Sequence, residues 1–92
     1  PRPSICLGVD EFHTPPGLID AAREAFSEFD IEINTPFAGT YVPLKFYERD
    51  RHVRGLMIEV RRAVCEEQQA LMAVQASLAR LVDTVQDLRC AR

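Results

Sequence analysis

The chain has 92 residues, a formal net charge of −3 and 47% hydrophobic residues, a composition that suits one small domain. It lacks the roughly twenty consecutive apolar residues of a membrane span and the start of a signal peptide, and its arginines alternate with acidic residues, which argues against nucleic acid as a partner. Three cysteines without CxxC spacing predict neither a disulfide framework nor a zinc ribbon, and we expect a reducing, cytoplasmic setting.

Strand, helix and strand follow one another in the first third of the chain. Residues 4–9 form a short apolar run that predicts a buried strand. Thr14, as a cap, and Pro15 are typical of a helix start, and apolar residues then recur at helical spacing to about residue 29. Residues 31–34 alternate as a second strand does. Such a βαβ unit predicts parallel strands joined by a right-handed crossover.

A long connection and a third strand come next. Residues 35–50 have no steady period, which is typical of a functional or mobile loop. Their aromatic side chains predict that the loop packs against the body. Residues 53–61 are predicted to form the third strand, with apolar residues on one face and Glu59 on the other.

A helix without glycine or proline is predicted from Glu66 onward. Its apolar residues follow a 3-4-3-4-3 spacing, and we call them the heptad seam: Leu71, Val74, Leu78, Leu81, Val85 and Leu88. Flanking positions lack the opposed charges of a coiled-coil pair, so we expect the seam to be buried mainly against the chain's own sheet. Pairing with another helix is the alternative. The predicted fold is therefore α/β, a small mixed sheet of the βαβ unit plus a third strand, flanked by helices and followed by a long C-terminal helix.

Glu59 is the first candidate for chemistry. A carboxylate within an apolar strand is costly to bury unless it is paired, so Glu59 either pairs with Arg54 or Arg61 or points into a wet cleft. In a cleft it could transfer protons during catalysis. The structural ion pair remains the alternative.

Two turns supply further candidates. Asn34 ends a strand, and the turn that follows, as far as Gly39, offers N–H donors to a carboxylate or an oxyanion, although an ordinary turn is the alternative. Asp10 and His13 lie between a strand end and a helix start, where ligands bind in open α/β folds. An Asp-x-x-His pair is not a metal signature, and a helix-start role is the alternative. We expect Glu59 to face one cleft shared with both turns.

Three blocks have the order and spacing found in one family. They are LGVDEFHTP (residues 7–15), NTPFAGTY (residues 34–41) and LMIEVRR (residues 56–62). Over about residues 5–62 the chain resembles the N-formylglutamate amidohydrolases. The resemblance implies a fold like part of a zinc-dependent carboxypeptidase. It also implies hydrolysis of N-formyl-L-glutamate, or a related N-acyl amino acid, to the amino acid and formate in histidine degradation.

The resemblance also implies roles for individual residues. Glu59 would be the catalytic carboxylate that activates a metal-bound water. The implied substrate-binding residues are Asn34, Thr35, Phe37, Gly39, Tyr41 and Arg62. Arg61 stands where other members often have Asn. Zinc is the implied cofactor, with ligands mostly outside this chain, and Asp10 and His13 are the weak candidates within it.

Two readings of the whole chain follow. In the first, residues 1–92 form a single domain that corresponds to the C-terminal portion of a larger metallohydrolase and is incomplete for catalysis alone. Its partner is a small N-acyl amino acid, without nucleic acid or membrane, and self-association through the C-terminal helix is a further expectation. In the second, the chain is a non-catalytic interaction or dimerisation module that pairs through the heptad seam.

Overall fold

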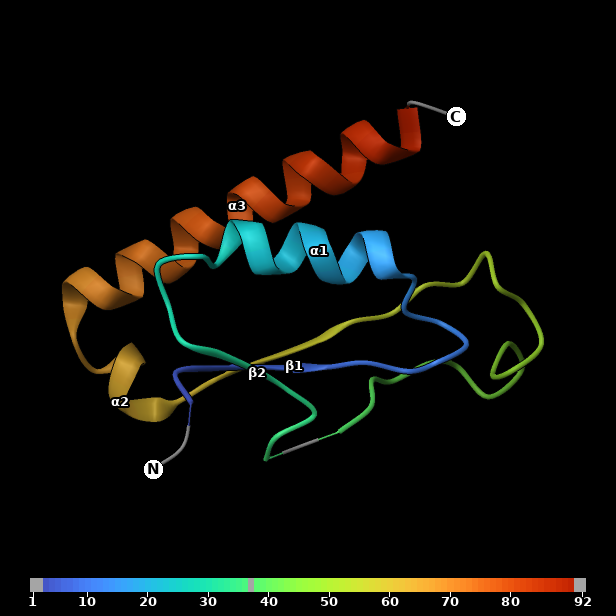
Figure 1. The fold of residues 1–92 in the computed structure, drawn as a ribbon, viewed down its shortest axis with the longest axis horizontal. Coiled ribbons are helices and arrows are strands. Elements are labelled where there is room, and N and C mark those ends of the chain that lie inside the picture. Colours follow the sequence, from blue (N-terminus) through green and yellow to red (C-terminus); the bar gives the residue numbers. More distant parts are fainter. Residues whose placement is uncertain (1–2, 37, 91–92) are drawn as a thin grey trace.

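A three-stranded mixed sheet with the two longer helices on one side carries the fold (Figure 1). The computed structural model describes residues 3–36 and 38–90, with side chains up to Asp87. Its elements in chain order are β1 (Ile5–Gly8), α1 (Pro16–Ala25), β2 (Ile31–Ile33), β3 (Met57–Val60), α2 (Arg62–Cys65) and α3 (Gln68–Cys90). The predicted α/β class, the mixed sheet and the long C-terminal helix are thereby confirmed.

Strand β1 is the centre of the sheet, in the order β2-β1-β3. It runs parallel to β2, as the βαβ pattern predicts, and antiparallel to β3. Cys6 of β1 lies opposite Glu32 of β2 and Glu59 of β3. Because side chains alternate along a strand, these three residues share the sheet face that is turned away from the helices, and we call it the open face.

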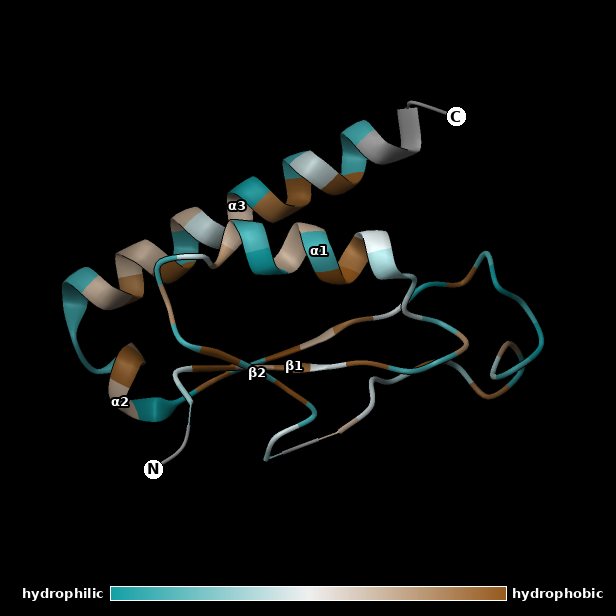
Figure 2. Ribbon diagram, viewed as in Figure 1, coloured by the Kyte–Doolittle hydropathy of each residue, from teal (hydrophilic) through white to brown (hydrophobic). Residues whose placement is uncertain are grey.

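The hydrophobic core fills the space between the sheet and the helices, where apolar residues of both layers meet (Figure 2). Its buried members are Ile5, Leu7, Ala21, Ala22, Ala25, Phe26, Val64, Val74 and Leu81. The alanines of α1 let this helix approach the sheet closely, and Phe26 at its end is fully buried. Each large apolar side chain buried in this way stabilises the fold by roughly 1.5–3 kcal/mol.

The start of α1 differs from the expectation that Thr14 caps it. The N-terminal cap is Pro15, without a side-chain hydrogen bond. Thr14 Oγ1 instead accepts from the Asp10 N–H and donates to the Gly55 carbonyl, at 2.9 and 2.6 Å. Thr14 therefore ties the end of β1 to the segment before β3. The helix also stops at Ala25, earlier than the expected residue 29.

Strand β3 is shorter than the predicted residues 53–61. The residues before it are bonded to the turn between β1 and α1 and not to a strand. The Val53 carbonyl accepts a hydrogen bond from the His13 side chain, and the Gly55 carbonyl accepts one from the Thr14 hydroxyl. The Gly55 N–H donates to the His13 carbonyl at 3.0 Å. The long loop that begins at residue 35 is also less packed against the body than its aromatic side chains predict, since Tyr41 is 84% exposed.

We expected α3 to pack on the sheet, but it packs mainly against α1 and α2. Helix α1 already covers that part of the sheet, so α3 lies alongside it (Figure 1). Val74, Ser77 and Leu81 are buried, whereas Leu78 of the heptad seam is 38% exposed. Arg80 joins the two helices, because its Nη2 donates to the Ala25 carbonyl and to Ser77 Oγ, both at 3.0 Å. None of the helices in the described part of the chain is long and apolar enough to cross a lipid bilayer.

The packing of α3 predicts unequal effects at two leucines of the seam. Leu81 is 6% exposed, and Leu81→Ala is expected to lower the free energy of unfolding by about 2–5 kcal/mol because it leaves a cavity in the hydrophobic core. Leu78→Ala should cost less. Urea unfolding followed by circular dichroism at two protein concentrations measures both effects. Equal losses, or a midpoint that climbs steeply with concentration, would contradict this packing.

Asp30 predicts how stability depends on pH. Hydrogen bonds from the Ser4 hydroxyl and backbone N–H lower the pKa of Asp30 below its usual 3.8, and Arg61 adds a smaller electrostatic effect. A folded pKa below the unfolded one means that the Asp30 carboxylate stabilises the fold above about pH 4, and that this contribution is lost as the pH falls through the folded value. Asp30→Asn should flatten that acid dependence in urea titrations. The exposed Asp20→Asn is the control, and identical pH curves for Asp30→Asn and wild type would show the idea to be wrong.

Candidate functional site

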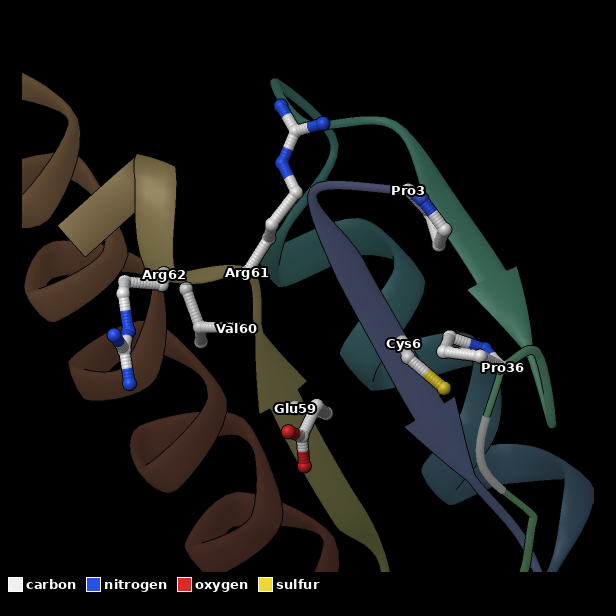
Figure 3. A pocket seen from close by; sticks show the side chains of 7 residues that line it. All are labelled: Pro3, Cys6, Pro36, Glu59, Val60, Arg61 and Arg62. Atoms are coloured by element: carbon white, nitrogen blue, oxygen red, sulfur yellow. The ribbon is translucent and has the colours of Figure 1, made fainter. Parts of the chain in front are cut away.

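Glu59 lines a pocket of about 340 Å³ on the open face, which we call the strand pocket. Its lining residues are Pro3, Cys6, Pro36, Glu59, Val60, Arg61 and Arg62. Figure 3 shows Glu59 and Cys6 on neighbouring strands, with Pro36 beside Cys6. Arg61 and Arg62 leave the end of β3 in different directions (Figure 3). The strand pocket thus combines one carboxylate, one thiol and the stems of two arginines.

The side chain of Glu59 is exposed, and no ion pair holds it among the described residues. Neither Arg54 nor Arg61 forms a salt bridge with it in the part of the chain that the structure describes. Arg61 has other contacts, since its backbone N–H donates to the Ser4 carbonyl at 3.0 Å. Glu59 therefore lines a pocket without an ion pair among the described residues, and its catalytic role stays a prediction.

Asn34 holds the turn that follows β2. Its φ of 58° is in the left-handed region, which Asn tolerates better than most residues. Its side-chain Oδ1 accepts from the Val9 N–H at 2.9 Å and from the Gly39 N–H at 3.3 Å. Asn34 therefore fastens the 34–39 turn to the end of β1, and its carbonyl oxygen is already engaged in this task.

Gly8 is the place where this turn crosses β1. A Cβ at Gly8 would meet the Gly39 carbonyl oxygen and the Met57 side chain, so only glycine leaves room for the crossing. Gly39 itself has a φ of 81°, which favours glycine. The Gly39 backbone consequently lies against the end of β1.

The turn between β1 and α1 is fixed by its own side chains. Asp10 Oδ1 accepts from the N–H groups of Phe12 and His13, at 2.8 and 2.9 Å. His13 is fully buried, with Nδ1 2.6 Å from the Val53 carbonyl and Nε2 accepting from the Glu48 N–H at 2.9 Å. A carbonyl can only accept, so Nδ1 carries the proton and the imidazole is neutral. His13 is thus a structural link to the long loop.

A second pocket, of about 640 Å³, lies beyond the 34–39 turn, and we call it the turn pocket. Its lining residues are Val9, Asp10, Glu11, Phe12, Ala38, Gly39, Glu48 and Arg51. Glu59 and Asp10 thus line different pockets, and the single cleft that the sequence predicts for them stays a prediction. Glu59 faces the strand pocket and Asp10 faces the turn pocket, because the 34–39 turn contributes Pro36 to one and Gly39 to the other.

The remaining predicted substrate residues are scattered. Arg62 lines the strand pocket together with Glu59. Thr35 is exposed, and its hydroxyl donates to the Ile33 carbonyl at 3.4 Å. Tyr41 is 84% exposed and lines neither of the two pockets. Phe37 lies outside the described residues.

The described residues do not fit a zinc ion by themselves. Over residues 3–36 and 38–90 no group of three or more His, Cys, Asp or Glu side chains could hold a metal ion. Both nitrogens of His13 are bonded to the backbone, and one oxygen of Asp10 already accepts two N–H groups. A catalytic zinc needs about three protein ligands, which Asp10 and His13 do not provide.

Sequence reasoning missed several residues that line the two pockets. Cys6 had the pattern of a core residue, and it is indeed buried, but it faces the strand pocket. Glu48 and Arg51 reach the turn pocket from the long loop. No local pattern marks them, because His13 and Thr14 hold that loop through contacts about forty residues apart in sequence.

Comparison with known families gave one finding. A family model described as N-formylglutamate amidohydrolase matches residues 1–66, which include the sheet, α1 and both pockets. Neither curated proteins nor solved structures gave a match.

The crossing at Gly8 predicts a large effect of one methyl group. Gly8→Ala places a Cβ against the Gly39 carbonyl and should lower the free energy of unfolding by about 1–3 kcal/mol while displacing the 34–39 turn. Gly17→Ala is the matched control, because a Cβ there meets nothing within 4 Å. Urea unfolding gives the energies, and amide chemical shifts of Val9 and Gly39 report the turn. Unmoved shifts in a stable Gly8→Ala variant would disprove the crossing.

Proposed function

The chain belongs to the N-formylglutamate amidohydrolase family, and we propose that it takes part in hydrolysing the formamide of N-formyl-L-glutamate, or of a related N-acyl amino acid. The observation that carries the proposal is Glu59, a carboxylate without an ion-pair partner among the described residues, in a pocket that Arg62 also lines. Unlike Glu32, the other exposed carboxylate of the open face, Glu59 lines a pocket, where a carboxylate suits proton transfer to and from a bound substrate.

In the proposed reaction Glu59 acts as general base and then as general acid. It takes a proton from the attacking water, whose oxygen adds to the formyl carbon. The C–N bond then breaks, and Glu59 returns the proton to the leaving nitrogen, so that formate and the free amino acid are released. Asn34 does not contact the reacting atoms in this scheme. It positions the 34–39 turn, whose Pro36 forms one wall of the strand pocket.

Arg62 is the proposed anchor for a substrate carboxylate. A guanidinium can donate two parallel hydrogen bonds to a carboxylate, which fixes its orientation as well as its position. In Figure 3 the Arg62 side chain leaves the strand pocket toward α3, so binding would require it to turn toward Glu59. Side-chain rotation at an exposed arginine is fast and does not limit turnover.

The wider context is part of the same proposal. We propose that residues 1–92 form one portion of a larger metallohydrolase domain with a carboxypeptidase-like fold, acting in histidine degradation in the cytoplasm. Zinc, which the family implies, would then be held by residues outside this chain, and the proton transfers proposed for Glu59 do not depend on where it is held. The alternative of an interaction module would need the heptad seam for a partner. Val74 and Leu81 of that seam are already buried within the chain, so we do not favour it.

Replacing Glu59 tests the proposal. Glu59→Gln keeps the shape and removes the base, so formate release from N-formyl-L-glutamate should fall by about 10²–10⁴-fold. Glu32→Gln is the matched control, because Glu32 is exposed on the same face and also lies opposite Cys6. The assay uses the natively expressed protein with zinc supplied. Equal rates for Glu59→Gln and wild type would overturn the assignment.

A further inference from the structure

The turn pocket has no part in the proposed hydrolysis, yet its chemistry is distinctive. Three of its lining residues are acidic, and the fourth charged one, Arg51, places its guanidinium carbon 4.0 Å from the centre of the Phe12 ring. Attraction between a cation and an aromatic face holds this contact. Arg51 forms no salt bridge within the described residues, so the contact with the Phe12 ring is the interaction that holds its guanidinium in the pocket.

The Phe12 ring is a rigid platform. It packs edge-on against the His13 ring, with 4.7 Å between ring centres. His13 cannot turn, because both its nitrogens are bonded to the backbone of the long loop. The backbone N–H of Phe12 is in turn held by Asp10. A preorganised aromatic face loses little entropy when a ligand binds to it.

The electrostatic field around this platform is negative. The pKa of Tyr47 is raised from its usual 10.0, first because of the charge on Glu48 and then because of the charge on Asp10. Both carboxylates line the turn pocket. Their combined field attracts cations and repels a free carboxylate.

We propose that the turn pocket is a binding site for an organic cation, a guanidinium or a primary ammonium, and that Arg51 occupies it in the free chain. The resident guanidinium on Phe12 shows which group the pocket accepts. A ligand cation would stack on the same ring and displace Arg51 into solvent. A metal ion does not suit the pocket, because no metal-holding group exists among the described residues.

The test removes the resident cation and offers a substitute. Arg51→Ala vacates the ring, and methylguanidinium titrated into this variant should bind at least tenfold more tightly than to wild type, as followed by amide chemical shifts of Phe12 and Gly39. Adding Glu48→Gln should weaken that binding. Arg54→Ala is the control, because Arg54 is exposed and does not line the pocket.

Two results would contradict a cation site in the turn pocket. Equal affinity of Arg51→Ala and wild type for methylguanidinium, or tighter binding of acetate, would overturn the proposal. Should Arg51→Ala fold poorly, Glu48→Gln in the wild-type chain still decides, because it must weaken binding of methylguanidinium. These measurements do not use formate release, so their outcome is independent of the proposed hydrolysis.

Discussion

The buried imidazole of His13 is the constraint on which the rest of the site depends. It joins the turn after β1 to two points of the long loop, the Glu48 N–H and the Val53 carbonyl. Thr14 adds a parallel link to Gly55. In so small a domain a loop of this length would otherwise be mobile. Two side chains adjacent in sequence thus give the loop a defined path, and that path sets both the start of β3 and the wall of the turn pocket.

The second organising feature is the crossing of the 34–39 turn over Gly8. Asn34 holds the turn to Val9, and Gly8 gives it room. Glu59 lines the strand pocket on the open face, and Asp10 lines the turn pocket beyond the end of β1. Asn34 and Gly8 together therefore fix Gly39, which lines the turn pocket, at the end of β1.

The sequence predicts the βαβ unit well, because periodicity and the proline-rich helix start are local signals. The third strand is predicted too long, since the partners of Val53 and Gly55 are side chains forty residues away. For the heptad seam the spacing predicts which side of α3 is apolar, but not that Leu78 stays partly exposed. That outcome depends on where α1 lies. Glu59 and Asp10 are identified from sequence, whereas no local pattern reveals that they line different pockets.

The two pockets differ in charge, and this difference constrains how a ligand can lie on the open face. N-formyl-L-glutamate carries two carboxylates, and the negative field of Asp10 and Glu48 repels them from the turn pocket. Its acidic groups would therefore be directed to the end of β3, where Arg62 stands near Glu59. Under the two proposals, the strand pocket would take an acidic substrate and the turn pocket a cation, so the two pockets would select groups of opposite charge.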